Sequence, residues 1–225
     1  MTAAVTAPAV RLPRRELSSL VAQIPGSTVI RLRRKEVVYG CLGRDPSIYL
    51  VEYGHVKVLS TSRDGKDCLL DVYGPGDLVG EVCLHGGVAA QTAVTMTPTL
   101  LRRISRARFL AALEHCGLRE ELVCYLAHRL SEQQQLITDF VTADSEYRLA
   151  AVLLHLARKM GRPSGPFLVL DLRITQEELS GMVGTTRSRV GLFLNRFIDN
   201  GLVHRACHGG LVVNETRLDC FMAQC

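Results

Sequence analysis

The sequence lacks the segments that place a protein in or across a membrane. A transmembrane helix needs about 20 consecutive apolar residues, and no stretch of this chain approaches that length. A secretory signal has its basic residues before its apolar segment, whereas here the uncharged residues 1–10 precede Arg11, Arg14 and Arg15. These absences predict a cytoplasmic protein with no membrane partner.

The sequence also lacks the usual metal and catalytic signatures. It has no C-x-x-C pair, which excludes the common zinc and iron–sulfur spacings. No Ser-His-Asp arrangement, phosphate-binding loop or pair of catalytic carboxylates stands out, so we do not expect an enzyme. We interpret the cysteines as small buried thiols, with a redox or ligand role left open for one of them. There are eight, at positions 41, 68, 83, 116, 124, 207, 220 and 225.

The first half of the chain has the pattern of an all-β domain. The composition is that of an ordinary globular protein, with 47% hydrophobic and 22% charged residues, and 225 residues are enough for two domains. Between residues 28 and 104, short runs rich in Val, Ile, Tyr and Thr alternate with turn signals such as Asp64-Gly65 and Gly74-Pro75-Gly76. This alternation predicts a β-sandwich or roll.

A helical pattern follows Arg106. Residues 107–113 suit a short helix, and a longer one then carries a stripe with steps of three and four residues. The stripe is too narrow for a helix surrounded by core, so we expect it to pack along one partner, as in a parallel homodimer. Packing on the chain's own β domain is the alternative. The stripe consists of Leu122, Leu126, Leu130, Gln133, Ile137 and Phe140.

The second half begins with a helix expected after Asp144, which places a domain boundary near residues 142–145. Pro163 to Pro166 is expected to form a loop and Phe167 to Leu172 a strand. Apolar runs at 202–204 and 211–213 bracket a Gly-Gly pair and predict a hairpin, with His208 at its tip as a candidate phosphate contact.

Residues 175–201 have the pattern of a helix-turn-helix. Thr175 and Glu178 form a capping box that starts the first helix, and Gly184 supplies the left-handed residue that ends it. Thr186 caps a second helix, which ends at Gly201. With the hairpin that follows, the unit is expected to be a winged helix.

The second of these helices is expected to have one apolar face and one basic face. Val190, Phe193, Leu194 and Phe197 lie on the inner side, and Ser188, Leu192 and Asn195 point the opposite way. An arginine near the start of an exposed helix can bind guanine O6 and N7, and flanking arginines can bind phosphates. An ordinary solvated basic helix is the alternative. The candidate DNA-binding residues are Thr186, Arg187, Ser188, Arg189, Leu192, Asn195 and Arg196.

Two segments resemble the family of the cyclic-AMP receptor protein and the fumarate–nitrate reduction regulator (Crp/Fnr). Residues 74–81, GPGDLVGE, are similar to the PGDxxGE stretch of the family's β-roll. Residues 174–190, ITQEELSGMVGTTRSRV, are similar to its ITxxELAxxxGxxRxxV recognition unit. The resemblance implies a homodimeric transcription factor that binds a palindromic operator in double-stranded DNA, with RNA polymerase as a further partner.

The resemblance also implies an α+β architecture: an N-terminal cyclic-nucleotide-binding-type β-roll (jelly roll), a long dimerisation helix and a C-terminal winged helix-turn-helix. On this basis we expect a flexible tail at 1–15, a β-roll sensor domain at 16–117, a dimerisation helix at 118–143 and a DNA-binding domain at 144–225. A small signal in the roll, or none, would set the angle of the DNA-binding domains across the hinge near residues 142–144.

The resemblance is weaker at the effector site. In cyclic-AMP-binding members the glutamate of the GE pair contacts the ribose, and an arginine ten residues later pairs with the cyclic phosphate. Glu81 matches the glutamate, but Gln91 replaces the arginine, which predicts weak cyclic AMP binding because neutral hydrogen bonds are about half as strong as charge-assisted ones. A cyclic nucleotide is the candidate cofactor, and no cofactor is established. The candidate effector-binding residues are Gly80, Glu81, Gln91, Thr92, Gln133 and Gln134.

Haem is a second candidate ligand. Cys83 and His85 lie where the carbon-monoxide-sensing haem regulator of this family has Cys and His, and residues two apart on a strand share a face. The iron–sulfur branch is excluded because no cysteine cluster occurs near the N-terminus. A regulatory subunit that binds a ligand and a protein without DNA is a further alternative, which the three exposed arginines disfavour.

The recognition helix also departs from the receptor-protein pattern of arginine, glutamate and a second arginine. Arg187 keeps the first arginine, whereas Ser188 and Leu192 replace the other two residues. We therefore expect half-sites about 10 bp apart, centre to centre, but of a different sequence. A leucine can contact only a thymine methyl group.

Overall fold

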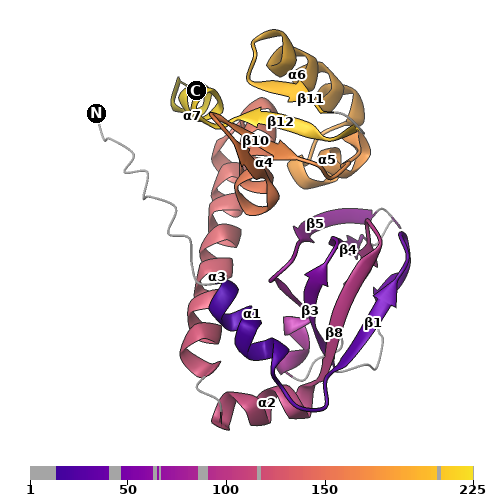
Figure 1. Cartoon of the computed structure of the whole chain (residues 1–225). Coiled ribbons are helices and arrows are strands. Elements are labelled where there is room, and N and C mark those ends of the chain that lie inside the picture. The colour runs from indigo at the N-terminus through magenta and orange to yellow at the C-terminus, as the bar shows by residue number, and fades with distance from the viewer. Residues whose placement is uncertain are drawn as a thin grey trace.

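The computed structural model describes residues 14–40, 47–62, 65, 67–85, 91–115, 118–206 and 209–224, with the backbone alone described for 14–16 and 85. It consists of a β-roll, a long helix and a smaller α/β unit above the roll (Figure 1). The N-terminal expectation was partly wrong. Residues Arg14–Ala22 form helix α1, so Arg14 and Arg15 belong to a helix and not to a tail. No helix among the described residues is long and apolar enough to cross a membrane.

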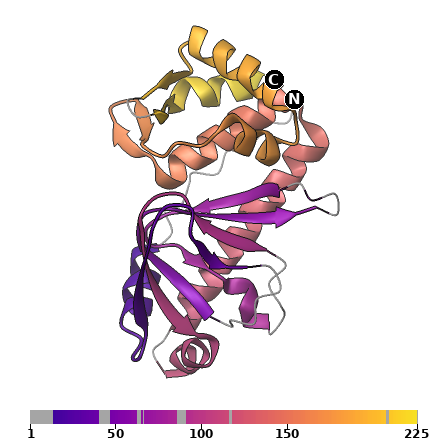
Figure 2. The ribbon, with the colours of Figure 1, turned by 90° about the vertical axis from the view of Figure 1, so that its right-hand side faces the viewer.

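The predicted β-roll is confirmed. It has two four-stranded antiparallel sheets, ordered β1-β8-β3-β6 and β2-β7-β4-β5. The strands of the roll lie below the second unit in Figure 2. Side chains alternate across β4, where Val56 and Val58 are buried between the sheets and Lys57 lies on the opposite side. The strands are β1 (Thr28–Leu32), β2 (Val37–Tyr39), β3 (Ser47–Tyr53), β4 (Val56–Thr61), β5 (Asp67–Tyr73), β6 (Leu78–Val79), β7 (Thr92–Thr95) and β8 (Thr99–Ser105).

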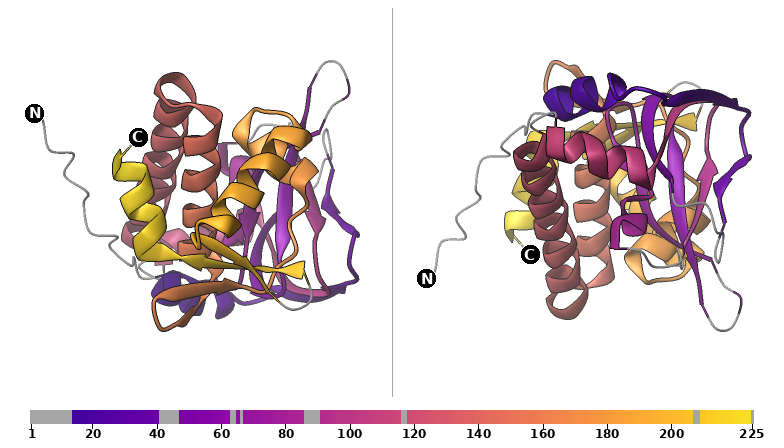
Figure 3. Two further views of the ribbon diagram at one scale, coloured as in Figure 1. Left: turned by 90° about the horizontal axis from the view of Figure 1, so that it is seen from above. Right: turned by 90° about the horizontal axis from the view of Figure 1, so that it is seen from below.

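Three helices cover one end of the roll. Helix α2 (Arg106–His115) leads from β8 to the foot of α3 (Leu118–Thr142), and α1 lies beside α3 (Figure 3, right). Leu17 and Val21 are one helical turn apart on α1 and pack in the same apolar cluster as Phe109 and Leu118. This cluster anchors the base of α3 to the roll.

Helix α3 runs from the foot of the roll to the second unit (Figure 1), and the predicted stripe on it was partly wrong. Leu122 is buried and Leu126 is partly buried against the chain's own roll, so neither is free to contact a second helix. Leu130 and Ile137 are 59% and 63% exposed, as the seam requires. Leu122, on the covered face of α3, and Val123, on the exposed face, are neighbours in the sequence. A spacing of three and four residues therefore fits either face.

The second unit begins where α3 breaks. Asp144 caps α4 (Ser145–Met160), and its carboxylate accepts hydrogen bonds from the backbone of Glu146 and Tyr147 at 2.9 and 2.8 Å. A four-stranded sheet of order β11-β12-β10-β9 packs on α4. The other elements are β9 (Arg162–Ser164), β10 (Phe167–Leu170), α5 (Gln176–Val183), α6 (Arg187–Asp199), β11 (Val203–Arg205), β12 (Leu211–Asn214) and α7 (Glu215–Gln224).

Two elements of this unit differ from expectation. The expected loop from Pro163 to Pro166 contains strand β9, which pairs with β10 at its edge, a position that tolerates a proline. Helix α7 was not predicted. It packs on α4, where Arg158 forms ion pairs with Glu215 at 2.8 Å and with Asp219.

Candidate functional site

The helix-turn-helix is built as its boundary residues predict. The Thr175 hydroxyl accepts a hydrogen bond from the Glu178 backbone at 3.2 Å, and the Glu178 carboxylate accepts one from the Thr175 backbone at 2.8 Å. Gly184 ends α5 with φ 67° and ψ 45°, the left-handed conformation that glycine adopts without steric cost. Thr186 caps α6, so the turn and both helix starts are fixed by local chemistry.

Helix α6 has the two faces that its sequence predicts. Val190, Phe193, Leu194 and Phe197 are buried in the core of the second unit. The opposite side, called here the α6 outer face, is solvent-exposed at every predicted position. It consists of Thr186, Arg187, Ser188, Arg189, Leu192, Asn195 and Arg196.

The three arginines of the α6 outer face differ in their surroundings. Arg196 pairs with Glu146 at 3.1 Å, while the guanidinium of Arg189 lies over the ring of Phe193 at 5.8 Å. No acidic side chain among the described residues pairs with Arg187. The face therefore offers a positively charged group at the helix start and two partly oriented ones farther along it.

The expected wing follows α6. Strands β11 and β12 pair antiparallel, with Val203 opposite Val213, and the Ala206 backbone donates a 3.0 Å hydrogen bond to the Gly210 carbonyl. The candidate phosphate contact His208 lies outside the described residues.

The predicted effector residues are placed on different elements. Gly80 has φ 91°, and a Cβ there would lie 2.8 Å from the Ser47 carbonyl oxygen, so the position requires glycine. Gln91 and Thr92, at the start of β7, are half-buried. Gln133 and Gln134 are exposed on α3. The α3 side chain that approaches Glu81 is instead Arg129.

Glu81 is held inside the roll. Its carboxylate accepts a 3.3 Å hydrogen bond from the Tyr73 hydroxyl and lies 3.8 Å from the Arg129 guanidinium. Burial raises the pKa of Glu81, and the charge of Arg129 opposes that shift. The candidate ribose contact is therefore already bonded to side chains of this chain.

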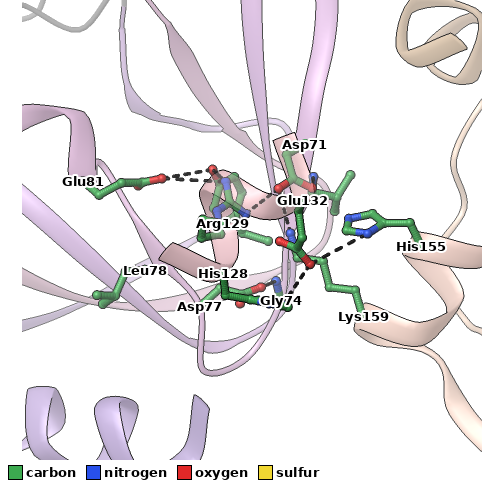
Figure 4. A network of polar contacts seen from close by, with 12 residues as sticks. Asp71, Gly74, Asp77, Leu78, Glu81, His128, Arg129, Glu132, His155 and Lys159 are labelled. Carbon is green, nitrogen blue, oxygen red and sulfur yellow. Dashed lines mark hydrogen bonds and ion pairs between the residues drawn. The ribbon is translucent and has the colours of Figure 1, made fainter. Parts of the chain in front are cut away.

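Arg129 belongs to a polar cluster that the sequence analysis missed, called here the Asp71 cluster: Asp71, Tyr73, Arg129 and Lys159. Figure 4 shows Asp71, Arg129 and Lys159 side by side. Asp71 accepts hydrogen bonds from Arg129 at 2.5 Å and from Lys159 at 2.8 Å. These residues come from β5, α3 and α4. An acidic residue within an otherwise apolar strand was the only local sign of the cluster.

The interpretation of the cysteines and of the haem pair needs correction. Glu81–His85 form a 3₁₀ helix, so the argument that Cys83 and His85 share a strand face was wrong. Among the described residues, no group of three or more His, Cys, Asp or Glu side chains could hold a metal ion. Cys83 is buried, as expected, but Cys124 and Cys220 are exposed.

Known proteins and protein families are similar to this chain in sequence and architecture. Residues 29–116 match the cyclic nucleotide-binding domain family, and residues 147–221 match the Crp-like helix-turn-helix domain family. The cyclic AMP receptor protein of Thermus thermophilus is 31% identical over 187 residues, which is 82% of each chain. A CRP-like cAMP-activated global transcriptional regulator of Mycobacterium tuberculosis is 28% identical over 173 residues, 76% of this chain and 77% of that protein. The structure of FixK2 from Bradyrhizobium japonicum shares the fold, with a TM-score of 0.73 at 21% identity, over 86% of this chain and 96% of that one.

Proposed function

Because this chain belongs to the Crp/Fnr family of DNA-binding transcriptional regulators, we propose that it binds a two-fold symmetric operator as a homodimer. The observation that carries the proposal is the α6 outer face, which is exposed and bears three arginines while the inner face holds the helix in the core. Arg187 reads a guanine edge in the major groove, and Arg189 and Arg196 contact phosphates.

The exposed side of α3 supports the homodimer. Four large apolar side chains recur there at helical spacing, and nothing in the described chain covers them. An uncovered apolar stripe along a 25-residue helix is the usual mark of a helix–helix interface. The four are Val123, Leu130, Ile137 and Val141, which are 65%, 59%, 63% and 80% exposed.

We further propose the division of labour that the elements suggest. Residues 14–117, which include all of α1, form the sensor domain, residues 118–143 dimerise and residues 144–225 bind DNA. The dimer works in the cytoplasm, with RNA polymerase as its partner. The Mycobacterium tuberculosis relative is described as cAMP-activated and the Thermus thermophilus relative as a cyclic AMP receptor protein, but cyclic AMP binding is weak here. Gln91 has no charge for a cyclic phosphate, and Glu81 is bonded to Tyr73 and Arg129.

Operator selection from a random duplex library, followed by anisotropy titrations, tests the proposal. We expect a palindromic consensus with half-sites about 10 bp apart. Affinity for random duplex should fall steeply as salt rises, because binding releases counterions. A flat salt response, or no binding at low ionic strength, would overturn the proposal. Calorimetry with cyclic AMP then tests the effector statement, which micromolar or tighter binding would contradict.

A further inference from the structure

The Asp71 cluster joins the two domains through one buried carboxylate. Asp71 lies on β5 of the roll, and its Oδ2 accepts hydrogen bonds from two cations on two different helices. Lys159 comes from the last turn of α4, in the second unit, and Arg129 comes from α3. Figure 4 shows the Arg129 and Lys159 side chains converging on the Asp71 carboxylate. The side chain of Asp71 is 7% exposed and that of Lys159 is 1% exposed.

Tyr73 completes the cluster. Its hydroxyl accepts a 2.6 Å hydrogen bond from Arg129 and donates to Glu81 at 3.3 Å. The ammonium of Lys159 and the guanidinium of Arg129 lie over its ring, at 4.8 and 4.7 Å from the centroid. The two cations, Arg129 and Lys159, thus lie beside the carboxylates of Asp71 and Glu81 inside the protein.

A second set of contacts holds α5 on the same strand pair. Lys57 of β4 forms a 2.8 Å ion pair with Glu178, the capping-box partner of Thr175 on α5. The Cys68 thiol of β5 donates to the Gly181 carbonyl at 3.5 Å. A Cβ on Gly181 would lie 3.4 Å from the Leu69 backbone nitrogen, so helix and strand pack closely.

Apolar packing continues across the same boundary. Leu69, Val72 and Met96 of the roll belong to one cluster with the core of the second unit, which includes Leu156 and Met182. The β4–β5 strand pair therefore contacts both the end of α4 and helix α5. All of these contacts are made while the α6 outer face remains exposed.

We propose that Asp71, Lys159 and Arg129 form a built-in clasp that positions the DNA-binding unit on the roll in its DNA-reading orientation. Operator binding then requires no small-molecule effector. The inference rests on the proposed function and concerns its control. The Lys159–Asp71 ion pair is specific to one arrangement of the domains, because it forms only when the end of α4 lies against β5.

The clasp raises the fraction of molecules in which the DNA-binding unit has this orientation. If the DNA-binding unit also samples other orientations, apparent operator affinity falls in proportion to the fraction of clasped molecules. Lys159 and Asp71 are positioning residues in this scheme, since neither contacts DNA. The clasp gives the orientation that an effector bridging the roll and α3 would otherwise have to stabilise.

The test is operator binding by Lys159→Met, which keeps the volume of the side chain and removes its charge. Asp71 keeps Arg129 as a partner in this variant. We expect operator affinity to fall about tenfold, while affinity for random duplex changes less than about twofold. Lys159→Arg keeps the charge but not the shape of the side chain, so it should lose less operator affinity than Lys159→Met.

Arg158→Met is the matched control. Arg158 is the neighbouring residue on α4, but its ion pairs with Glu215 and Asp219 lie within the DNA-binding unit. We expect no change in operator affinity for this variant. Should Lys159→Met fail to fold, Lys57→Met removes the partly buried ion pair with Glu178 of α5. We expect this variant to lower operator affinity about threefold.

A disulfide between the roll and α5 tests whether Lys159 acts by positioning the DNA-binding unit or by stabilising the whole protein. A Cβ on Gly181 would lie 3.8 Å from the Cys68 Cα, so Gly181→Cys is within disulfide reach of Cys68. In the Lys159→Met background, oxidation of this pair should restore operator affinity, and dithiothreitol should abolish the rescue. Lys159→Met alone, oxidised in the same way, controls for the other thiols.

The outcomes distinguish the two proposals. Wild-type protein that ignores duplex DNA overturns the proposed function. Wild-type protein that binds its operator while Lys159→Met binds equally well, or more tightly, overturns the clasp alone. A failure of the disulfide to restore binding in a folded Lys159→Met variant also contradicts it.

Discussion

The carboxylate of Asp71 accepts a 2.8 Å hydrogen bond from the ammonium of Lys159, although 88 residues separate the two in the sequence. Burial by itself raises the pKa of Asp71, but the charges of Lys159 and Arg129 outweigh it and lower the pKa to about 2. An unfolded aspartate has a pKa of about 3.9. The ionised cluster therefore adds stability that is complete above about pH 4 and is lost as pH falls toward about 2.

Asp71→Asn should consequently be strongly destabilising at neutral pH. The change leaves buried Lys159 without its carboxylate and leaves Arg129 with only Glu81, at 3.8 Å. We therefore expect the free energy of unfolding to fall by about 3–5 kcal/mol at pH 7. Urea unfolding at pH 7 and near pH 3 should show a smaller difference from wild type at the lower pH. Glu215→Gln, at an exposed ion pair, should cost less than about 1 kcal/mol. An equal loss at both pH values for Asp71→Asn would contradict this account.

His155 should make the protein less stable in mild acid. Burial lowers the pKa of this histidine, as do Lys159 and Arg129, while Asp71 and Glu132 oppose the shift. The unfolded state then binds more protons below about pH 6.5, so stability falls as pH decreases from that value through the folded pKa. The melting temperature of wild type should drop more between pH 7 and pH 5 than that of His155→Gln. His115→Gln, on the exposed side of α2, should behave like wild type.

Much of the fold was predictable because its signals are local. The capping pair Thr175 and Glu178 and the turn residue Gly184 define the helix-turn-helix without reference to the rest of the chain. The roll was predictable from turn spacing. Which face of α3 is covered was not, because Leu122 and Val123 are adjacent and only packing against the roll decides which one is buried.

The Asp71 cluster could not be predicted from spacing. Its members come from three elements, and Arg129 and Lys159 read as ordinary surface cations on helices. Only the folded chain brings them to one carboxylate. The predicted contacts Gln133 and Gln134 came from the family resemblance, and in the single chain both are exposed while Arg129 reaches the roll.

The exposed stripe of α3 predicts how to separate the subunits. Ile137 is 63% exposed in the single chain, so Ile137→Glu should leave the fold intact and place a charge in each copy of the interface. We expect a monomer in sedimentation equilibrium at micromolar concentration, with operator affinity reduced at least about tenfold. Val29→Glu, at a 45% exposed position on β1, should remain dimeric. A dimeric Ile137→Glu would show that the subunits pair through another surface.

Leu192 predicts a methyl contact in the operator. Its side chain is 52% exposed on the α6 outer face, and the thymine C5-methyl is the apolar group that the major groove offers. Replacing thymine by deoxyuridine at each operator position in turn should identify one position per half-site where wild type loses about 1 kcal/mol. Leu192→Ala should bind the thymine and deoxyuridine operators equally, whereas Ser188→Ala should keep the preference. If the preference survives in Leu192→Ala, another side chain makes the contact, and if no thymine matters to wild type, Leu192 does not reach the bases.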